Sequence, residues 1–410
     1  GVGVFANRWS VAYRAINDAN FVIKYLPLLD TVNTQRVPKT VPSSPTTFWA
    51  DDIINQLKGE ALFIRSFAYM ELLRVYAYEP GKEVDGWDLG VILRDTPTEA
   101  VSSADFRARS TNLECYEFVE NDLLEAISLL KTPTQLAGAG AWPASLGTIS
   151  STFRASKATA HALLARHYLY WGRYADADAQ ATLALSLIAS PAPVNAAGYA
   201  ASWGTVIHPE SIFELEVRPT DFSGVTGPND SMHSMTQNAI SGSQYVMSAS
   251  AELIAAHEAT DVRRTVYVTN AQTLNKPQVR KWQGEKGSYV ENIPVIRKSE
   301  MYLIQAESRA RLGGNDAGAQ TAVNTIRTNR GLTATTATGQ ALIDLIMNER
   351  RLEFAFEGHR FFDLKRLGMD IPKTAASGVA TLPYTDFRIL QQLPNDEVRL
   401  NTLLRQNPGY

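Results

Sequence analysis

One stretch near the C-terminus, residues 342–368, constrains the fold more than any other. It reads LIDLIMNERRLEFAFEGHRFFDLKRLG. At about 100° per residue, a helix over this stretch has apolar side chains in two stripes on roughly opposite faces. The first stripe holds Leu345, Leu352 and Phe356, and the second holds Ile343, Met347, Phe354 and Phe361. A helix that is apolar on two faces lies between two layers, so we expect one long buried helix here.

The same stretch carries charged residues within its apolar stripes. Glu349 falls in the first stripe, and Arg350 and Glu357 fall in the second. An unpaired buried charge costs on the order of several kcal/mol. We therefore predict an ion-pair network that anchors the scaffold, made of Glu349, Arg350, Glu353, Glu357, Arg360 and Asp363. Gly358 costs about 1 kcal/mol relative to alanine inside a helix, and we expect that it allows a close backbone approach.

Helical patterns also fill the N-terminal part of the chain. Residues 7–26 place Trp9, Tyr13, Ile16 and Asn20 at three- and four-residue spacing, which indicates a helix face. Residues 27–49 are rich in proline, serine and threonine, so we predict a loop. Further helices are predicted over 52–80 and 112–131, with an extended piece at 91–93 between them.

An internal repeat follows. Residues 157–191 fit the 34-residue tetratricopeptide pattern, with apolar or small residues at helix-packing positions: Tyr168, Gly172, Tyr174, Ala177 and Ala184. His161 and Ala181 depart from that pattern. A weaker copy spans 298–331. Helical hairpins of this kind stack side by side.

Two irregular stretches, 132–152 and 192–294, interrupt the repeats, and the second contains short strand-like runs. The predicted fold is therefore mainly α, a tetratricopeptide-like scaffold of helical hairpins with long loops and a small irregular or β insertion. We expect one domain over 1–410. It comprises N-terminal helical repeats (1–191), a loop-rich ligand-binding insertion (192–294), and a C-terminal helical repeat, anchor helix and tail (295–410).

Composition and motifs argue against several functions. The 39 basic and 42 acidic residues leave a net charge of −3, so a nucleic-acid partner is not expected. Cys115 is the only cysteine, which excludes an intrachain disulfide and a cysteine metal site. No nucleophile elbow, phosphate loop or zinc-protease motif is present. Glu349, Glu353 and Glu357 share one helix with arginines, which favours salt bridges over catalysis. We predict no catalytic residue, metal or cofactor.

The remaining possibility is that aromatic side chains bind a ligand. Sugar faces carry C–H groups that stack on aromatic rings, while polar side chains hold the hydroxyls. Six aromatics in the irregular stretches are the predicted ligand-binding residues: Trp87, Trp142, Trp203, Tyr245, Tyr267 and Tyr289. For each of them, packing within its own loop is the alternative. Trp9 and Trp171 lie on helical patterns and are expected in the core, and Trp282 is expected to have a structural role.

The run from Asn348 to Arg366, NERRLEFAFEGHRFFDLKR, resembles the C-terminal signature of the SusD/RagB family. Three further blocks, at 9–26, 57–78 and 156–188, resemble family segments and occur in the family's order, and the C-terminal block extends over 293–368. The resemblance implies a surface glycan-binding lipoprotein of the outer membrane of a Gram-negative bacterium. Such a protein captures an oligosaccharide, or less often a peptide, without turnover.

The same resemblance implies a partner and an anchor. The partner is a SusC-like TonB-dependent outer-membrane transporter, to which the ligand is delivered. The membrane is contacted only through a lipidated N-terminal cysteine, and since the chain begins GVGVFANRWS, we expect a truncated or processed form. One alternative is a tetratricopeptide adaptor that binds peptides or proteins. A second is a glycan hydrolase, which needs two carboxylates that face each other across a cleft.

Overall fold

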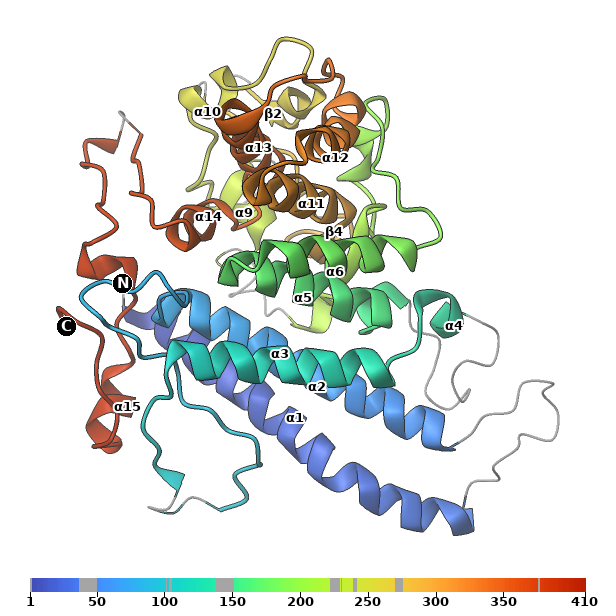
Figure 1. Ribbon diagram of the computed structural model, residues 1–410, viewed down its shortest axis with the longest axis vertical. Coiled ribbons are helices and arrows are strands. Elements are labelled where there is room, and N and C mark those ends of the chain that lie inside the picture. The colour runs from blue at the N-terminus through green and yellow to red at the C-terminus, as the bar shows by residue number, and fades with distance from the viewer. Residues whose placement is uncertain are drawn as a thin grey trace. The chain divides into compact units, whose positions relative to one another are not determined.

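The computed structural model describes residues 2–36, 50–100, 102, 105–137, 151–221, 229, 231–238, 242–269, 276–374 and 377–410. Trp142 therefore lies outside the described residues. Two compact units make up the chain (Figure 1). Unit 1 comprises Gly1–Arg173, Phe361–Lys373 and Ala380–Tyr410, and unit 2 comprises Tyr174–Arg360 and Thr374–Val379.

Both units are mainly helical, which confirms the predicted fold class. Unit 1 contains α1 (Val2–Arg36), α2 (Ala50–Tyr76), α3 (Asn112–Leu129), α4 (Pro133–Ala137), η3 (Ser151–Phe153), α5 (Lys157–Trp171), α14 (Arg360–Arg366, without its first residue), η8 (Phe387–Ile389) and α15 (Asn395–Leu400). Unit 2 contains α6 (Tyr174–Ser186), α7 (Tyr199–Ser202), β1 (Ser211–Leu215), η4 (Pro219–Asp221), α9 (Met232–Thr236), α10 (Ala251–Ala255), η5 (Val262–Val266), β2 (Tyr267–Val268), β3 (Gln278–Val279), β4 (Ile293–Arg297), α11 (Lys298–Leu312), α12 (Asp316–Asn329) and α13 (Gly339–Glu353).

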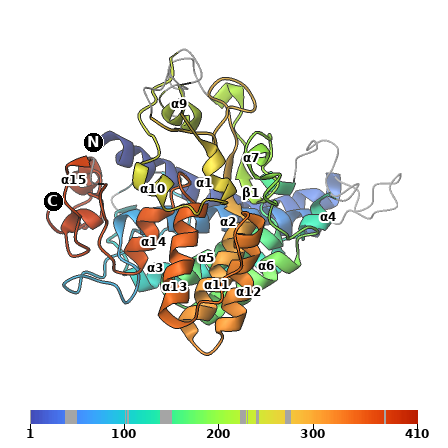
Figure 2. The ribbon, with the colours of Figure 1, turned by 90° about the horizontal axis from the view of Figure 1, so that it is seen from above.

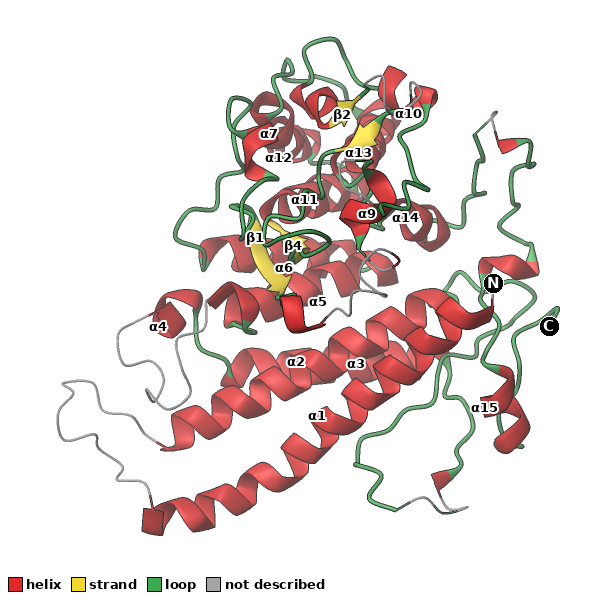
Figure 3. Cartoon of the chain, turned by 180° about the vertical axis from the view of Figure 1, so that it is seen from behind, coloured by secondary structure: helices red, strands yellow, loops and turns green. Residues whose placement is uncertain are grey.

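In unit 1, α2 packs between α1 and α3, and α5 packs on α3 (Figures 1 and 3). The spacing of apolar residues explains this layer, since Trp9, Ile16 and Ala19 are buried on one face of α1. Helix α3 begins with a capping box, in which Thr111 and Glu114 satisfy each other's backbone N–H groups. Gly172 ends α5 in the left-handed conformation, with φ of 77°.

The first loop was predicted too early in the sequence. Helix α1 continues through Pro27 to Arg36, whereas the sequence predicted a loop from residue 27. Proline lacks one N–H group and removes one intrahelical hydrogen bond, which weakens a helix but does not always end it. Loop composition therefore indicated the loop but not its first residue.

In unit 2, helices α6, α12 and α13 each pack against α11 (Figure 2). Helices α11 and α12 form the helical hairpin predicted over 298–331, and α5 and α6 occupy the repeat predicted over 157–191. The core between α11, α12 and α13 consists of apolar side chains: Leu303, Ala306, Ala310, Ala319, Ala322, Val323, Ile326, Leu342, Ile346 and Phe354. The strand-like runs of the insertion form two antiparallel pairs, β1 with β4 and β2 with β3.

The long anchor helix predicted over 342–368 is broken. Helix α13 ends at Glu353, and turns lead to α14. The Glu353 carbonyl accepts hydrogen bonds from Lys281 Nζ at 2.7 Å and Arg297 Nη2 at 3.3 Å, so it is not available to continue the helix. Phe356 and Gly358 have φ of 64° and 81°. The expected close approach at Gly358 was wrong, because a Cβ there would meet nothing within 4 Å; its left-handed backbone is what favours glycine.

Candidate functional site

A buried ion-pair network lies at the centre of unit 2. Glu353 accepts hydrogen bonds from Arg330 at 2.8 and 2.9 Å and from Arg297 at 3.0 Å. Glu357 accepts from Arg297 Nε at 2.8 Å and from Lys281 at 2.6 Å. Burial alone would raise the pKa of Glu353, but the guanidinium groups of Arg330 and Arg297 hold it well below its usual value. The carboxylate therefore stays ionised.

The network connects α13 to the insertion. Glu349 of α13 accepts from Arg263 of η5 at 2.8 Å and from Arg327 of α12 at 2.6 Å. Glu210, which precedes β1, accepts from Arg297 and Arg330, each at 2.9 Å. These partners lie far apart in the sequence. The network thus connects α13 to η5, α12, β4 and the segment before β1.

Three of the six predicted anchor residues, Glu349, Glu353 and Glu357, contribute carboxylates to this network. Arg350 is buried, with its Nε 3.6 Å from Glu307. Arg360 is half-buried at the start of α14. Asp363 belongs to unit 1, where it pairs with Arg366 at 2.9 Å.

Two of the predicted ligand aromatics pack around the network. Trp203 is only 3% exposed, and its ring lies 4.8 Å from Lys281 Nζ and 5.2 Å from Arg297 Cζ. Tyr267 packs against His257 and Phe356. A ring that covers buried cations in this way stabilises them by cation–π attraction. In this structure Trp203 is a core side chain, because it packs over Lys281, which follows β3, and Arg297 of β4.

Tyr245 and Tyr289 remain in surface loops of unit 2. Both are half-buried, among the exposed residues Gln244, Val246 and Ser288. Their backbones are left-handed, with φ of 41° and 69°. The Tyr245 hydroxyl donates to the Lys276 carbonyl at 2.5 Å, and a Cβ at Gly242 would lie 3.1 Å from the Tyr289 hydroxyl. Left-handed backbone at a non-glycine residue costs about 1–2 kcal/mol, and such residues cluster at active sites, ligand clamps and switch regions.

Hydrogen bonds tie both loops to α9, since the Tyr245 N–H donates to the Ser234 carbonyl at 2.9 Å and Glu291 of the Tyr289 loop also bonds to this helix. The Glu291 carboxylate accepts from Ser231 Oγ at 2.9 Å and from the His233 N–H at 3.0 Å.

Burial, with Glu291 and Glu214 nearby, raises the pKa of Glu285 to about 7. Close to neutral pH this carboxyl group is therefore present in both forms, and it can donate or accept a hydrogen bond.

Trp87 lies in unit 1 and is half-buried. Its Nε1 donates to Asn407 Oδ1 at 3.2 Å, and the Arg405 guanidinium lies 4.9 Å from its ring centre. The ring also packs against the buried cluster of Tyr78, Leu364 and Ile389. These contacts correspond to packing of Trp87 within unit 1, the alternative that the sequence analysis left open.

Unit 1 contains a cavity that the sequence analysis did not predict. Its volume is about 420 Å³, and side chains from three segments line it: Trp9, Ser10, Tyr13, Arg14 and Asn17 of α1; Ile92, Arg94, Thr98 and Phe106; and Glu397, Leu400 and Asn401 in and just after α15. The signal in the sequence was weak. Ser10, Arg14 and Asn17 share a polar face of α1, but nothing local shows that residues 92–106 and 397–401 pack beside it.

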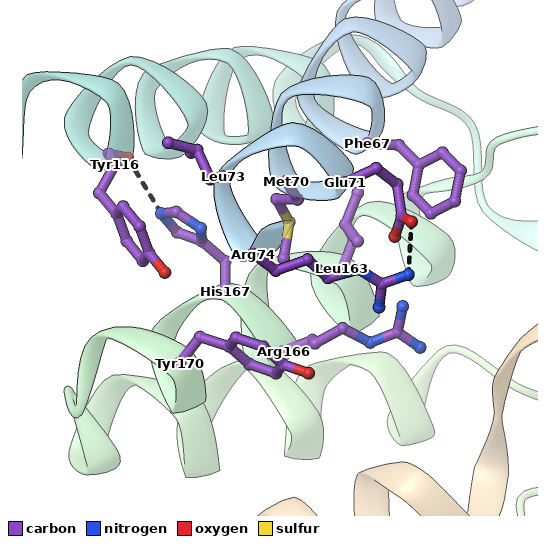
Figure 4. Close-up of a pocket in the computed structure, with 10 residues that line it drawn as sticks. All are labelled: Phe67, Met70, Glu71, Leu73, Arg74, Tyr116, Leu163, Arg166, His167 and Tyr170. Atoms are coloured by element: carbon purple, nitrogen blue, oxygen red, sulfur yellow. Dashed lines mark hydrogen bonds and ion pairs between the residues drawn. The ribbon is translucent and has the colours of Figure 1, made fainter. Parts of the chain in front are cut away.

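A second cavity in unit 1, between α2, α3 and α5, has a volume of about 10 Å³ (Figure 4). That volume is enough for one water molecule. His167 Nε2 lies 3.0 Å from the Tyr116 carbonyl, and burial lowers the pKa of this histidine to about 3. The Tyr170 hydroxyl has no hydrogen-bond partner among the residues that the structure describes. This cavity is too small for an organic ligand.

The described residues show neither a membrane span nor a metal site. None of the helices in that part of the chain is long and apolar enough to cross a bilayer. Nowhere in the same residues do three His, Cys, Asp or Glu side chains meet in a way that would hold a metal ion.

Comparison with known protein families gives two matches that cover most of the chain. The model described as "SusD family" matches residues 254–410, and the model described as "Starch-binding associating with outer membrane" matches residues 3–169. The chain belongs to the SusD/RagB family. Membership places it among carbohydrate-binding proteins associated with the outer membrane.

Individual relatives agree with this SusD/RagB assignment. The SusD-like protein P2 of Formosa agariphila is 24% identical over all of this chain and 81% of its own length. A SusD superfamily protein of Bacteroides vulgatus has a similar structure, with a TM-score of 0.75 and 25% identity over 98% of this chain and 85% of that one. A laminarin-binding SusD-like protein shares the fold at 22% identity, with a TM-score of 0.69 over 99% of this chain and 86% of that one.

Proposed function

We propose that this SusD/RagB protein captures an oligosaccharide at the cell surface and delivers it to a SusC-like TonB-dependent transporter without cleaving it. Family membership supports carbohydrate binding, and one structural neighbour is named for laminarin binding. The lipid anchor and the transporter are proposed from the family alone. The ligand-binding residues are proposed from the geometry of unit 2.

Tyr245 and Tyr289 are the observation that supports this site. They are half-buried aromatics on adjoining loops, and both are held in a backbone conformation that tyrosine rarely adopts. Their rings would stack on sugar faces. Gln244 and Glu285 lie in the same two loops and would hydrogen-bond to hydroxyl groups.

Binding without turnover is consistent with the chemistry of the buried carboxylates. Hydrolysis of a glycosidic bond uses one protonated carboxylic acid and one carboxylate across a cleft. Glu349, Glu353 and Glu357 are instead each paired with at least two cationic side chains. Such pairing removes the free carboxylate that a nucleophile or a general base requires.

The test is affinity electrophoresis and calorimetry with laminarin and starch. We expect binding to one of them, and Tyr245→Ala or Tyr289→Ala should weaken it about two- to twelvefold, because an aromatic contact contributes roughly 0.5–1.5 kcal/mol. Tyr25→Ala, at an exposed tyrosine of α1, is the matched control and should leave affinity unchanged. Unchanged affinity in both loop variants would show that the site lies elsewhere. Release of reducing ends during incubation would contradict binding without turnover.

A further inference from the structure

The 420 Å³ cavity of unit 1 has the size of a ligand site, since such pockets measure roughly 300–1,000 Å³. It lies in a different unit from Tyr245 and Tyr289. Figures 1 and 3 show the segments that form it, namely α1, the loop that follows α2 and the region of α15.

The walls of this cavity are held by hydrogen bonds. The Tyr13 hydroxyl accepts from the Ile92 N–H and donates to the Ile92 carbonyl, both at 2.9 Å. Asn17 Oδ1 accepts from the Thr98 N–H at 2.8 Å. Asn401 Nδ2 donates to the Arg107 carbonyl at 2.9 Å. These hydrogen bonds fix the walls of the cavity, which lowers the entropic cost of ordering them on binding.

Two charged side chains of the lining are uncommitted. Neither the exposed Arg14 guanidinium nor the half-buried Glu397 carboxylate has an ion-pair or hydrogen-bond partner within the described residues. Phe106 is 41% exposed, and Leu400 contributes an exposed aliphatic side chain. The free groups thus comprise several donors, one acceptor carboxylate, one aromatic ring and one aliphatic surface.

This set fits a ligand without net charge that both donates and accepts hydrogen bonds. An anion would be attracted by Arg14 and repelled by Glu397, and the reverse holds for a cation. A sugar hydroxyl can accept from the guanidinium while another donates to the carboxylate, and the C–H face of the ring can pack on Phe106. We propose that this cavity is a second oligosaccharide subsite for an uncharged glycan. The inference rests on the proposed function, because it assumes that the protein binds glycans.

Calorimetry with laminarihexaose and with maltohexaose tests the proposal on the full chain. We expect two molecules of one of these glucans per chain. The double variant Arg14→Ala/Glu397→Gln should bind one molecule, with the remaining affinity within twofold of the loop site in the unaltered protein. Arg264→Ala and Glu117→Gln, at exposed residues outside the cavity, are matched controls and should retain two. Thermal midpoints of all variants show whether folding is intact.

The outcomes separate this inference from the proposed function. One molecule per chain, lost with Tyr245→Ala/Tyr289→Ala and unaffected by Arg14→Ala/Glu397→Gln, overturns the second subsite and leaves the proposed site standing. Binding that is lost only with the Arg14 and Glu397 substitutions supports the cavity and overturns the loop site. If the chain binds neither laminarihexaose nor maltohexaose, the second subsite is overturned for both of these glucans. A stoichiometry of two that the cavity substitutions do not change overturns it as well.

Discussion

Three half-buried aromatic residues of unit 2 share a left-handed backbone. Tyr245, Tyr289 and Phe356 all have positive φ, and all three are only half-buried aromatics. Phe356 lies in the turns between α13 and α14, whereas the two tyrosines lie in surface loops. The same local strain thus has a structural role at one position and is proposed to serve ligand binding at two others.

Glu285 gives a prediction at this scale, because burial raises its pKa to about 7 from an ordinary value near 4.5. Between pH 4.5 and 7 the unfolded chain loses this proton and the folded chain keeps it, so the folded state binds more protons and stability falls as pH rises. Glu285→Gln removes this dependence. Its thermal midpoint should fall less than that of the unaltered protein between pH 5 and 7.5. Parallel curves for the two proteins would contradict the raised pKa.

Among the elements, α13 has the most specific set of partners. Its carboxylates pair with cations from η5, β4 and α12 and from the residue after α12. Glu353 is fully buried. Ion pairs in such places are sensitive to the loss of one partner, because the remaining charge stays in a site that water does not reach. We therefore expect the contacts of α13 with η5 and β4 to be weakened if α13 loses a carboxylate.

Glu349→Ala tests this at the level of the helix. It removes the Glu349 carboxylate from Arg263 and Arg327, while Arg263 keeps its pairs with Asp261 and Glu353, and should lower the free energy of unfolding by roughly 3–5 kcal/mol. Asp344→Ala, at an exposed residue of the same helix, is the control and should change it by less than about 0.5 kcal/mol. Urea unfolding measures both. A similar midpoint for the two variants would show that the network contributes little.

For the whole molecule, the C-terminal residues are part of the N-terminal unit. Lys365 donates to the Ala77 carbonyl at 2.6 Å and to Glu79 at 2.8 Å. Asn407 donates to the Tyr76 carbonyl at 3.0 Å and accepts from Arg109 at 2.8 Å. The first 173 residues therefore do not make up the whole of unit 1. Its folding depends on contacts between residues some 300 positions apart.

Deleting residues 380–410 should consequently expose the core of unit 1. Cys115 reports this, because it is fully buried and burial raises the pKa of its thiol to about 12. We expect the thiol to resist Ellman's reagent in the full chain and to react within minutes in the truncated one. Leu403→Ala, at an exposed residue of the tail, controls for changes at the surface. Equal protection in both chains would show that the tail does not stabilise the unit.

The sequence alone determined the features that depend on neighbouring residues. Apolar spacing predicted the main helices and the α11–α12 hairpin, and charges within an apolar face predicted that Glu349 and Glu357 have partners. Only the tertiary structure decided which partners these are, because Arg263, Arg297 and Arg330 reach α13 from separate elements. It also ended α13 at Glu353, buried Trp203 and formed the cavity beside Arg14. Each of these results depends on groups far apart in the chain, which local periodicity does not encode.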